Sequence, residues 1–252
     1  MRAREALRQP FLHLCEVAGG AACACWCAAA DRRVAEARAA VGDDADWSAS
    51  SSSLRLRAVA EIEPDEVWRI VWRDPLRSTC AALLGPRLVC DLDQAWVRRQ
   101  YAPAHAPRLH HAHSWHQDGA LGFDFRAHAD PPFPADALLE MVTAWIALVP
   151  CGVDAPGLEL AAQSPGALLA PIELTADRVG ARFAPDRLHR PALAAGDALV
   201  FRGDIVHRTH VAPAMTRDRT SLELRFFAAD RIPARLRGER FSRPACAPRS
   251  AP

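Results

Sequence analysis

A His-X-Asp motif and one remote histidine limit the folds open to this chain. His116 and Asp118 are two residues apart, and His207 lies far downstream. In an extended strand, residues i and i+2 project from the same face, so this pair can grip one metal ion while Gln117 points away. Two imidazoles and one carboxylate can hold one face of an Fe(II) ion and leave positions open for substrate and O2. We therefore expect a fold that brings a remote strand carrying His207 beside the motif.

A second pair with the same spacing follows His207. Arg219 and Ser221 are two apart, so both can face one cavity, and Arg225 lies on the same face further along. An arginine fork suits the free carboxylate of a metal-bound keto acid. A half-exposed strand with a charged outer face is the competing interpretation. We favour an inward-facing Arg219 with Ser221 beside it, and Arg225 is the rival anchor.

Other histidines offer alternative metal ligands. A second His-X-Asp motif, His128 to Asp130, precedes two prolines and is typical of a loop, whereas the first follows Trp115 and precedes alternating apolar residues. The histidines at 110, 111 and 113 suggest a zinc site, but without a thiolate a solvated loop is the simpler interpretation. His210 falls on the opposite face of its strand from His207.

The composition excludes several classes of chemistry. The chain has 252 residues, of which 50% are hydrophobic and 24% charged, with a formal net charge of +1. This balance gives no field that would attract nucleic acid or a membrane surface. All 31 basic residues are arginine, so Schiff-base catalysis and lysine-dependent phosphate loops are excluded. A small-molecule substrate remains the expected partner, and the oligomeric state stays open.

Cysteine usage indicates the compartment. The eight cysteines do not form the dense framework of a small secreted domain, which favours a reducing, cytoplasmic location. Cys23, Cys25 and Cys27 suggest a metal clip, but ordinary packing in an alanine-rich stretch is favoured. An apolar run over 17–30 follows several arginines as in a signal peptide, yet its Ala, Gly and Cys content argues against one.

The order of predicted elements indicates the fold class. Residues 1–45 and 63–84 are expected to be helical, with a serine-rich loop over 46–53 between them. The strand-rich part begins at 89–92, and strands are predicted at 141–149, 198–201, 205–209 and 219–227. The expected fold is mainly β with helical cover, a jelly-roll or cupin-like barrel. We treat 1–252 as one domain: a helical part over 1–88, a β core over 89–227 and an arginine-rich tail over 228–252.

Several stretches in this order resemble the phytanoyl-CoA dioxygenase family of Fe(II)- and 2-oxoglutarate-dependent oxygenases. They are Ser114–Gly119, Thr143–Leu148, Gly196-Asp197, Gly203–Arg208 and Arg219–Phe227, spread over about half of the chain. The resemblance implies a double-stranded β-helix. It implies iron held by His116, Asp118 and His207. It also implies 2-oxoglutarate bound by Arg219, with further contacts from Ser221, Arg99, Gln100 and Thr143.

The resemblance also implies a reaction. A small organic molecule would be hydroxylated with O2, while 2-oxoglutarate is converted to succinate and CO2. Asp118 favours hydroxylation, because relatives that halogenate lack that carboxylate. One departure is the stretch 162–166, which lacks the histidine of a Gly-Ser-His motif common in the family. Two alternatives remain: a cupin-like metalloprotein without keto-acid chemistry, and a binding barrel without catalysis.

Overall fold

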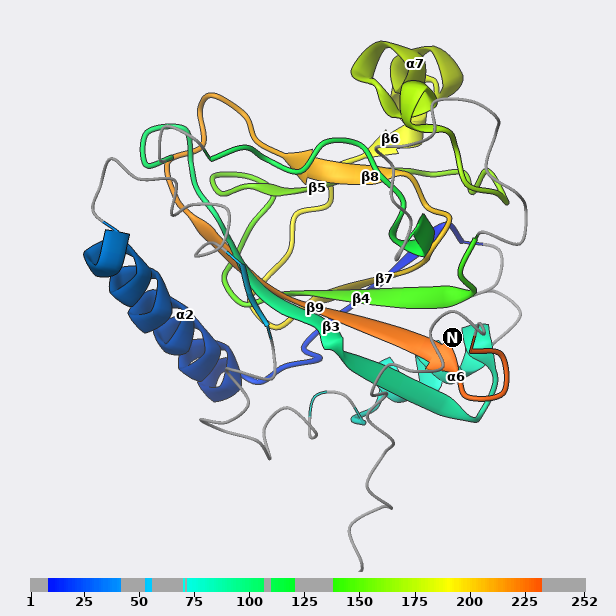
Figure 1. The fold of residues 1–252 in the computed structure, drawn as a ribbon, viewed down its shortest axis with the longest axis horizontal. Coiled ribbons are helices and arrows are strands. Elements are labelled where there is room, and N and C mark those ends of the chain that lie inside the picture. The colour runs from blue at the N-terminus through cyan, green and yellow to red at the C-terminus, as the bar shows by residue number, and fades with distance from the viewer. Residues whose placement is uncertain are drawn as a thin grey trace, which may run out of the picture.

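Two antiparallel sheets form the body of the protein, as seen in a computed structural model that describes residues 9–41, 53–55, 70, 72–106, 110–120 and 138–232 (Figure 1). The larger sheet has six strands in the order β1 (Phe11–Leu14), β7 (Ala198–Arg202), β4 (Met141–Ala147), β9 (Arg219–Ala228), β3 (Leu88–Gln100) and β2 (Ser53–Arg55). The smaller sheet has the order β6 (Leu188–His189), β5 (Gly157–Ala161) and β8 (His207–His210). Neither sheet closes on itself within the described residues.

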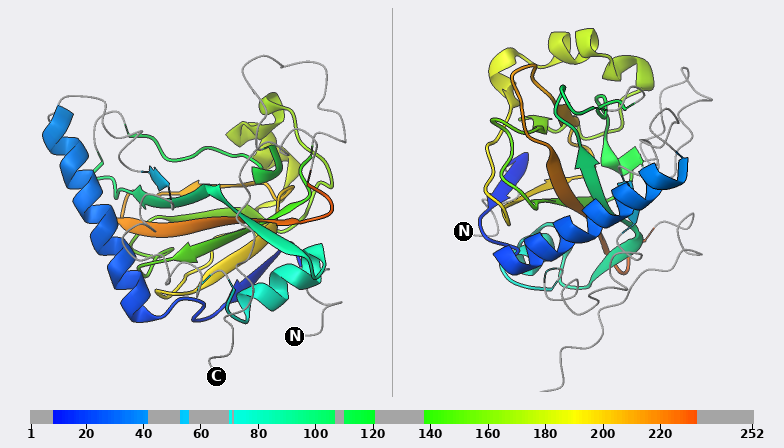
Figure 2. Two further views of the ribbon diagram at one scale, coloured as in Figure 1. Left: turned by 60° about the horizontal axis from the view of Figure 1, so that its bottom comes forward. Right: turned by 90° about the vertical axis from the view of Figure 1, so that its left-hand side faces the viewer.

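Helices cover one face of the larger sheet. Helix α2 (Gly20–Val41) runs obliquely across it, and α6 (Leu76–Leu84) packs near one end (Figure 2). The core between these helices and the sheet includes Trp26, Leu76 and Phe226, all buried. A third helix, α7 (Ala176–Arg182), packs beside the short 3-10 helix η3 (Pro171–Leu174). The turn η4 (Pro185–Arg187) then leads into β6.

Strand β9 is buried on both faces, and its alternation separates the two environments. Leu222, Leu224 and Phe226 belong to the core under the helices. Burying such side chains contributes about 1.5–3 kcal/mol each. Arg219, Ser221, Glu223 and Arg225 are also buried, on the face toward the smaller sheet. The expectation of an inward-facing polar row is therefore confirmed, and these charges need partners there.

The prediction of a mainly β protein with helical cover is confirmed, with corrections. The four strands predicted between 141 and 227 all form. The prediction of helix throughout 1–45 is wrong at β1, which is too short for a strand pattern to stand out and is held by pairing with β7. The strand β5 was not predicted. The second His-X-Asp motif, most of the serine-rich loop and the tail beyond 232 lie outside the described residues.

Among the helices that the structure describes, none combines the length and the apolar character needed to cross a membrane.

Candidate active site

The three predicted metal ligands come together in the structure. Asp118 Oδ1 lies 3.8 Å from His116 Nε2 and 3.9 Å from His207 Nε2. One ligand atom from each residue lies within 4.8 Å of the others. The two histidines also exchange backbone hydrogen bonds, 2.9 Å from His116 N to His207 O and 3.0 Å in the other direction. This isolated bridge fixes the remote ligand beside the motif. We call the three residues the triad.

The path of the chain through the motif differs from the expected strand. Asp118 begins a 3-10 helix, η1 (Asp118–Ala120), immediately after the bridge at His116. Gln117 still points away from the triad. Its amide nitrogen donates to Ala167 O and Asp204 O, and its oxygen accepts from Leu169 N at 2.7 Å. Gln117 therefore ties the motif to two loops.

Both histidines are oriented by their second ring nitrogen. Nδ1 of His116 is 2.7 Å from Ser114 O, and Nδ1 of His207 is 3.0 Å from Ile205 O. A carbonyl partner requires a proton on Nδ1, which leaves the Nε2 lone pair available to a metal. Burial, reinforced by the nearby His116, lowers the pKa of His207 to about 4. The neutral imidazole that metal binding requires is therefore the form present at neutral pH.

The carboxylate of Asp118 is held from two sides. Thr143 on β4 donates its hydroxyl to Oδ2 at 2.5 Å, and Arg225 on β9 donates Nη2 to Oδ1 at 3.2 Å. Burial alone would raise the pKa of Asp118, but Arg225 and the two histidines bring it well below its usual range. Asp118 is thus an oriented anion. Thr143, expected from the resemblance as a cosubstrate contact, thus lies against a triad residue.

A cavity of about 260 Å³ opens beside the triad. Its wall combines the triad with charged and apolar side chains. The lining residues are Trp96, Arg98, His113, His116, Asp118, Trp145, Leu158, His207, Thr209, Glu223 and Arg225. Sequence reasoning missed Trp96, Arg98 and Leu158 altogether, although the spacing of Trp96, Arg98 and Gln100 on β3 was a usable signal.

Buried charges form a chain along this wall. Arg98 donates Nε to Glu223 at 3.0 Å, and Arg225 lies 3.5 Å from the other Glu223 oxygen. Arg98 Nη1 also lies 2.8 Å from His113 Nε2. Burial would raise the pKa of Glu223, but Arg98 and then Arg225 lower it to about 2. The formal charges of Arg98 and Arg225 therefore balance those of Glu223 and Asp118.

Arg219 is fully buried and sits just behind the cavity wall. Its Nη1 donates to Ser221 at 3.1 Å, and its Cζ lies 4.9 Å from the centre of the Trp145 ring. Its Nε and Nη2 atoms have no hydrogen-bond partner among the described residues. Burial lowers the pKa of Arg219 to about 10. A buried guanidinium with two unused donors has the chemistry to bind an anion.

The structure separates the two candidates on β3. Gln100 pairs with Arg219 in the β3–β9 register and is buried beside it. Arg99 lies on the opposite face, where it forms an ion pair with Asp31 of α2 and donates to the Thr220 hydroxyl at 3.3 Å. Gln100 therefore lies at the predicted site, whereas Arg99 lies in the interface between the sheet and helix α2.

Comparison with known proteins gives the family. The model for phytanoyl-CoA dioxygenase (PhyH) matches residues 8–212, which is more than half of the chain. The chain belongs to the phytanoyl-CoA dioxygenase family. The match includes all three triad residues and ends before Arg219. A search of curated protein sequences finds no match.

Solved structures share the fold of this phytanoyl-CoA dioxygenase family member. EctD from S. alaskensis, in its apo form, is 17% identical with a TM-score of 0.65, covering 92% of this chain and 78% of EctD. The α-ketoglutarate-dependent epimerase SnoN from nogalamycin biosynthesis is 19% identical with a TM-score of 0.59, covering 90% and 79%. AviO1 from Streptomyces viridochromogenes Tue57 is 17% identical with a TM-score of 0.57, covering 92% and 96%. At these identities the likeness concerns the fold.

Proposed function

We propose that the protein is an Fe(II)- and 2-oxoglutarate-dependent dioxygenase that hydroxylates a small organic molecule. The observation that carries the proposal is the convergence of His116, Asp118 and His207 beside a cavity. Family membership supports an oxygenase. EctD has been solved with bound iron, and SnoN with Fe3+ and α-ketoglutarate. We propose that this chain also binds iron and 2-oxoglutarate.

The residues present fit these groups. Two neutral imidazoles and one carboxylate make the donor set that non-haem Fe(II) oxygenases use, and they leave coordination positions open. The carbonyl partners of both histidines leave the Nε2 lone pairs free for the ion that the triad would hold. Iron would thus be held by the triad, while Thr143 and Arg225 keep the Asp118 carboxylate oriented.

The cosubstrate would be anchored by Arg219. Its two unused donors are the strongest support for an anion site there, and Ser221 and Gln100 lie on the same face. Arg225 is placed differently, because it already contacts Asp118 next to the triad. We therefore assign the far carboxylate of 2-oxoglutarate to Arg219. Since Trp145 covers Arg219 from the cavity side, its indole has to shift for the carboxylate to reach the guanidinium.

The same proposal covers the architecture. We propose that the two open sheets are the halves of a double-stranded β-helix and that 1–252 forms one oxygenase domain. The bridge between His116 and His207 supports this arrangement, since it adds the motif to the edge of the smaller sheet beside β8. A cytoplasmic location and the absence of nucleic-acid or membrane partners stay expectations from the composition.

With iron and 2-oxoglutarate bound, the centre would supply oxidation of an unactivated C–H bond by O2, with release of succinate and CO2. The chain would contribute a dry, shaped cavity. Trp96, Trp145 and Leu158 line it with apolar surface, and the paired charges of Arg98 and Glu223 supply polar contacts. Because the four charges on the cavity wall balance, we propose a largely uncharged substrate.

The reaction outcome requires a product measurement, because SnoN is an epimerase. The experiment is to incubate iron-loaded protein with 2-oxoglutarate, O2 and a metabolite extract, and to follow succinate and new products by mass spectrometry. Hydroxylation predicts a product about 16 Da heavier, from insertion of one oxygen atom. Succinate with a product of unchanged mass would replace hydroxylation by epimerisation. Iron binding without decay of 2-oxoglutarate would support the cupin-like alternative.

A further inference from the structure

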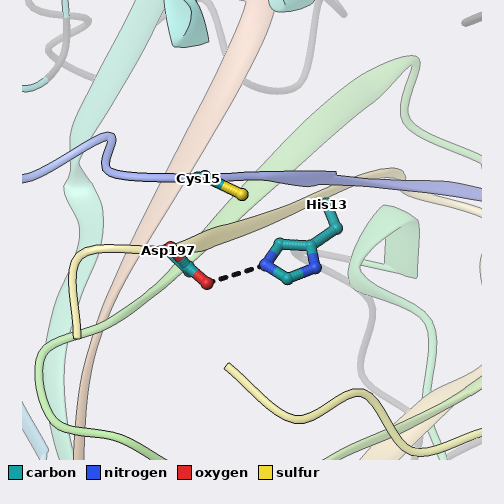
Figure 3. Close-up of side chains that lie close together, drawn as sticks. All are labelled: His13, Cys15 and Asp197. Carbon is teal, nitrogen blue, oxygen red and sulfur yellow. Dashed lines mark hydrogen bonds and ion pairs between the residues drawn. The ribbon is translucent and has the colours of Figure 1, made fainter. Parts of the chain in front are cut away.

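A second group of metal-ligating side chains lies at the start of the larger sheet, outside the active site. His13 and Cys15 are two residues apart along β1 and its exit, so they project from the same face. Leu14 pairs with Ala198, which places Cys15 opposite Asp197 as the next pair in the antiparallel register. Figure 3 shows the imidazole, the thiol and the carboxylate pointing toward one another.

The three side chains are close enough to converge on one ion. His13 Nε2 lies 2.8 Å from Asp197 Oδ2. One ligand atom from each of His13, Cys15 and Asp197 lies within 4.8 Å of the other two. His13 and Cys15 are exposed, whereas Asp197 is only 6% exposed. An ion can therefore reach the group from solvent and meet a carboxylate that the protein holds in place.

The backbone around Asp197 is held by several hydrogen bonds. Its Oδ1 accepts a hydrogen bond from Glu16 N and its Oδ2 from Ala194 N, both at 3.1 Å. Ala18 N donates to Gly196 O, and a Cβ at Gly196, which has φ +91°, would lie 2.2 Å from Ala18 O. The turn before β7 and the exit from β1 are therefore locked together. The three side chains meet on a fixed frame, as a metal site requires.

We propose that His13, Cys15 and Asp197 bind a borderline-soft divalent cation such as Zn2+, which joins β1 to the turn before β7. A thiolate, an imidazole and a carboxylate suit zinc and do not suit the oxygen-seeking Mg2+ or Ca2+. Water would fill the fourth position. Binding converts the Cys15 thiol to a thiolate and releases its proton. The ion replaces the hydrogen bond between His13 and Asp197, and the ring proton of His13 then sits on Nδ1.

This site is independent of the proposed reaction. Its cysteine ligand gives a spectroscopic signal that the triad, which has no sulfur, cannot give. The test is to titrate metal-free, full-length protein with Co(II). We expect one equivalent at the triad and one at the new site, with a thiolate-to-cobalt charge-transfer band arising only from the latter. Cys15→Ser should remove the band and one equivalent. His207→Ala should remove the other equivalent and keep the band.

Matched variants make the result decisive. Cys25→Ser, a thiol of α2 outside the group, should leave both equivalents and the band unchanged. Cys15→Asp should restore the second equivalent without the band, because aspartate supplies an oxygen ligand. Zn2+ should raise the melting temperature of the wild type more than that of Cys15→Ser. Binding of only one equivalent of Co(II) by the wild type would overturn the proposal, and so would a charge-transfer band that survives Cys15→Ser.

Discussion

Arg225 donates to the same Asp118 oxygen that faces the two histidines of the triad. Nη2 of Arg225 lies 3.2 Å from Oδ1, and that oxygen lies 3.8 Å and 3.9 Å from the two Nε2 atoms. The interaction links the metal ligand to the buried charges on β9. Arg225, the rival anchor for the cosubstrate, thus has a structural reason to be there that needs no cosubstrate.

Replacing His207 by Ala should abolish stoichiometric binding of Fe(II) at the triad. His207 supplies one of three ligands, and its imidazole is fixed by Ile205 O and by the backbone bridge to His116. Removing a ligand should cost more than the roughly 10–100-fold in metal affinity that outer contacts are worth. Iron content per chain after anaerobic loading measures it. Full occupancy in this variant would move the site elsewhere, with His128→Ala as the next variant to test.

Arg225→Gln should weaken iron binding and destabilise the fold together. Asp118 would lose an orienting donor, so we expect a roughly 10–100-fold loss of metal affinity. Asp118 and Glu223 would also lose a buried countercharge, at a cost of about 3–5 kcal/mol in the free energy of unfolding. Metal titration and urea denaturation measure the two effects. The control is Arg217→Gln, an exposed partner of Asp154, which should cost about 1 kcal/mol or less. Equal effects of the two variants would contradict the prediction.

Arg219→Ala should raise the Michaelis constant for 2-oxoglutarate while iron still binds. A buried, charge-assisted contact is worth about 2–5 kcal/mol, or roughly 30- to several-thousand-fold in affinity. Steady-state succinate formation at varied 2-oxoglutarate, with iron content measured in parallel, separates cosubstrate binding from metal loss. If the constant stays unchanged in Arg219→Ala, and rises in an iron-loaded Arg225 variant, then Arg225 is the anchor.

Local spacing in the sequence predicted the triad. It could not predict which side chains from different strands would contact one another. The i, i+2 pattern on β9 gave the correct faces, because alternation is a local property of strands. At the motif it gave the correct pair, His116 and Asp118, although Asp118 begins a 3-10 helix and not a strand. The same reasoning could not choose between Arg99 and Gln100. A register irregularity lies between Asp91 and Trp96, and a bulge shifts which residues face the cavity. The pairing of Arg98 with Glu223 likewise depends on which strands become neighbours.

Acid should destabilise the protein through Glu223. The folded-state pKa of this buried carboxyl is lowered to about 2 from an ordinary value of 4.5, so the ionised form stabilises the fold. That contribution is complete above pH 4.5 and is lost as the pH falls toward 2. In Glu223→Gln, the unfolding free energy should be lower at neutral pH and should change less over this acid range. Thermal denaturation at stepped pH measures it, with exposed Glu36→Gln as the control. A wild-type slope retained in Glu223→Gln would refute the role of this carboxyl.

Gly119→Ala should disturb the triad without removing a ligand. Gly119 N donates to Gly203 O at 2.7 Å, and a Cβ at Gly119 would lie 2.8 Å from that same oxygen and 2.5 Å from Leu138 Cδ1. The added methyl must push the Asp118 segment away from the segment that leads into His207. We expect a cost of about 1–3 kcal/mol in stability and weaker iron binding. The matched control is Gly180→Ala on α7, where a Cβ meets nothing within 4 Å and the helix should gain about 0.5–1 kcal/mol. Unfolding curves and iron affinities of the two variants test the contrast, and unaltered iron binding in Gly119→Ala would show that the two segments can separate without moving the ligands.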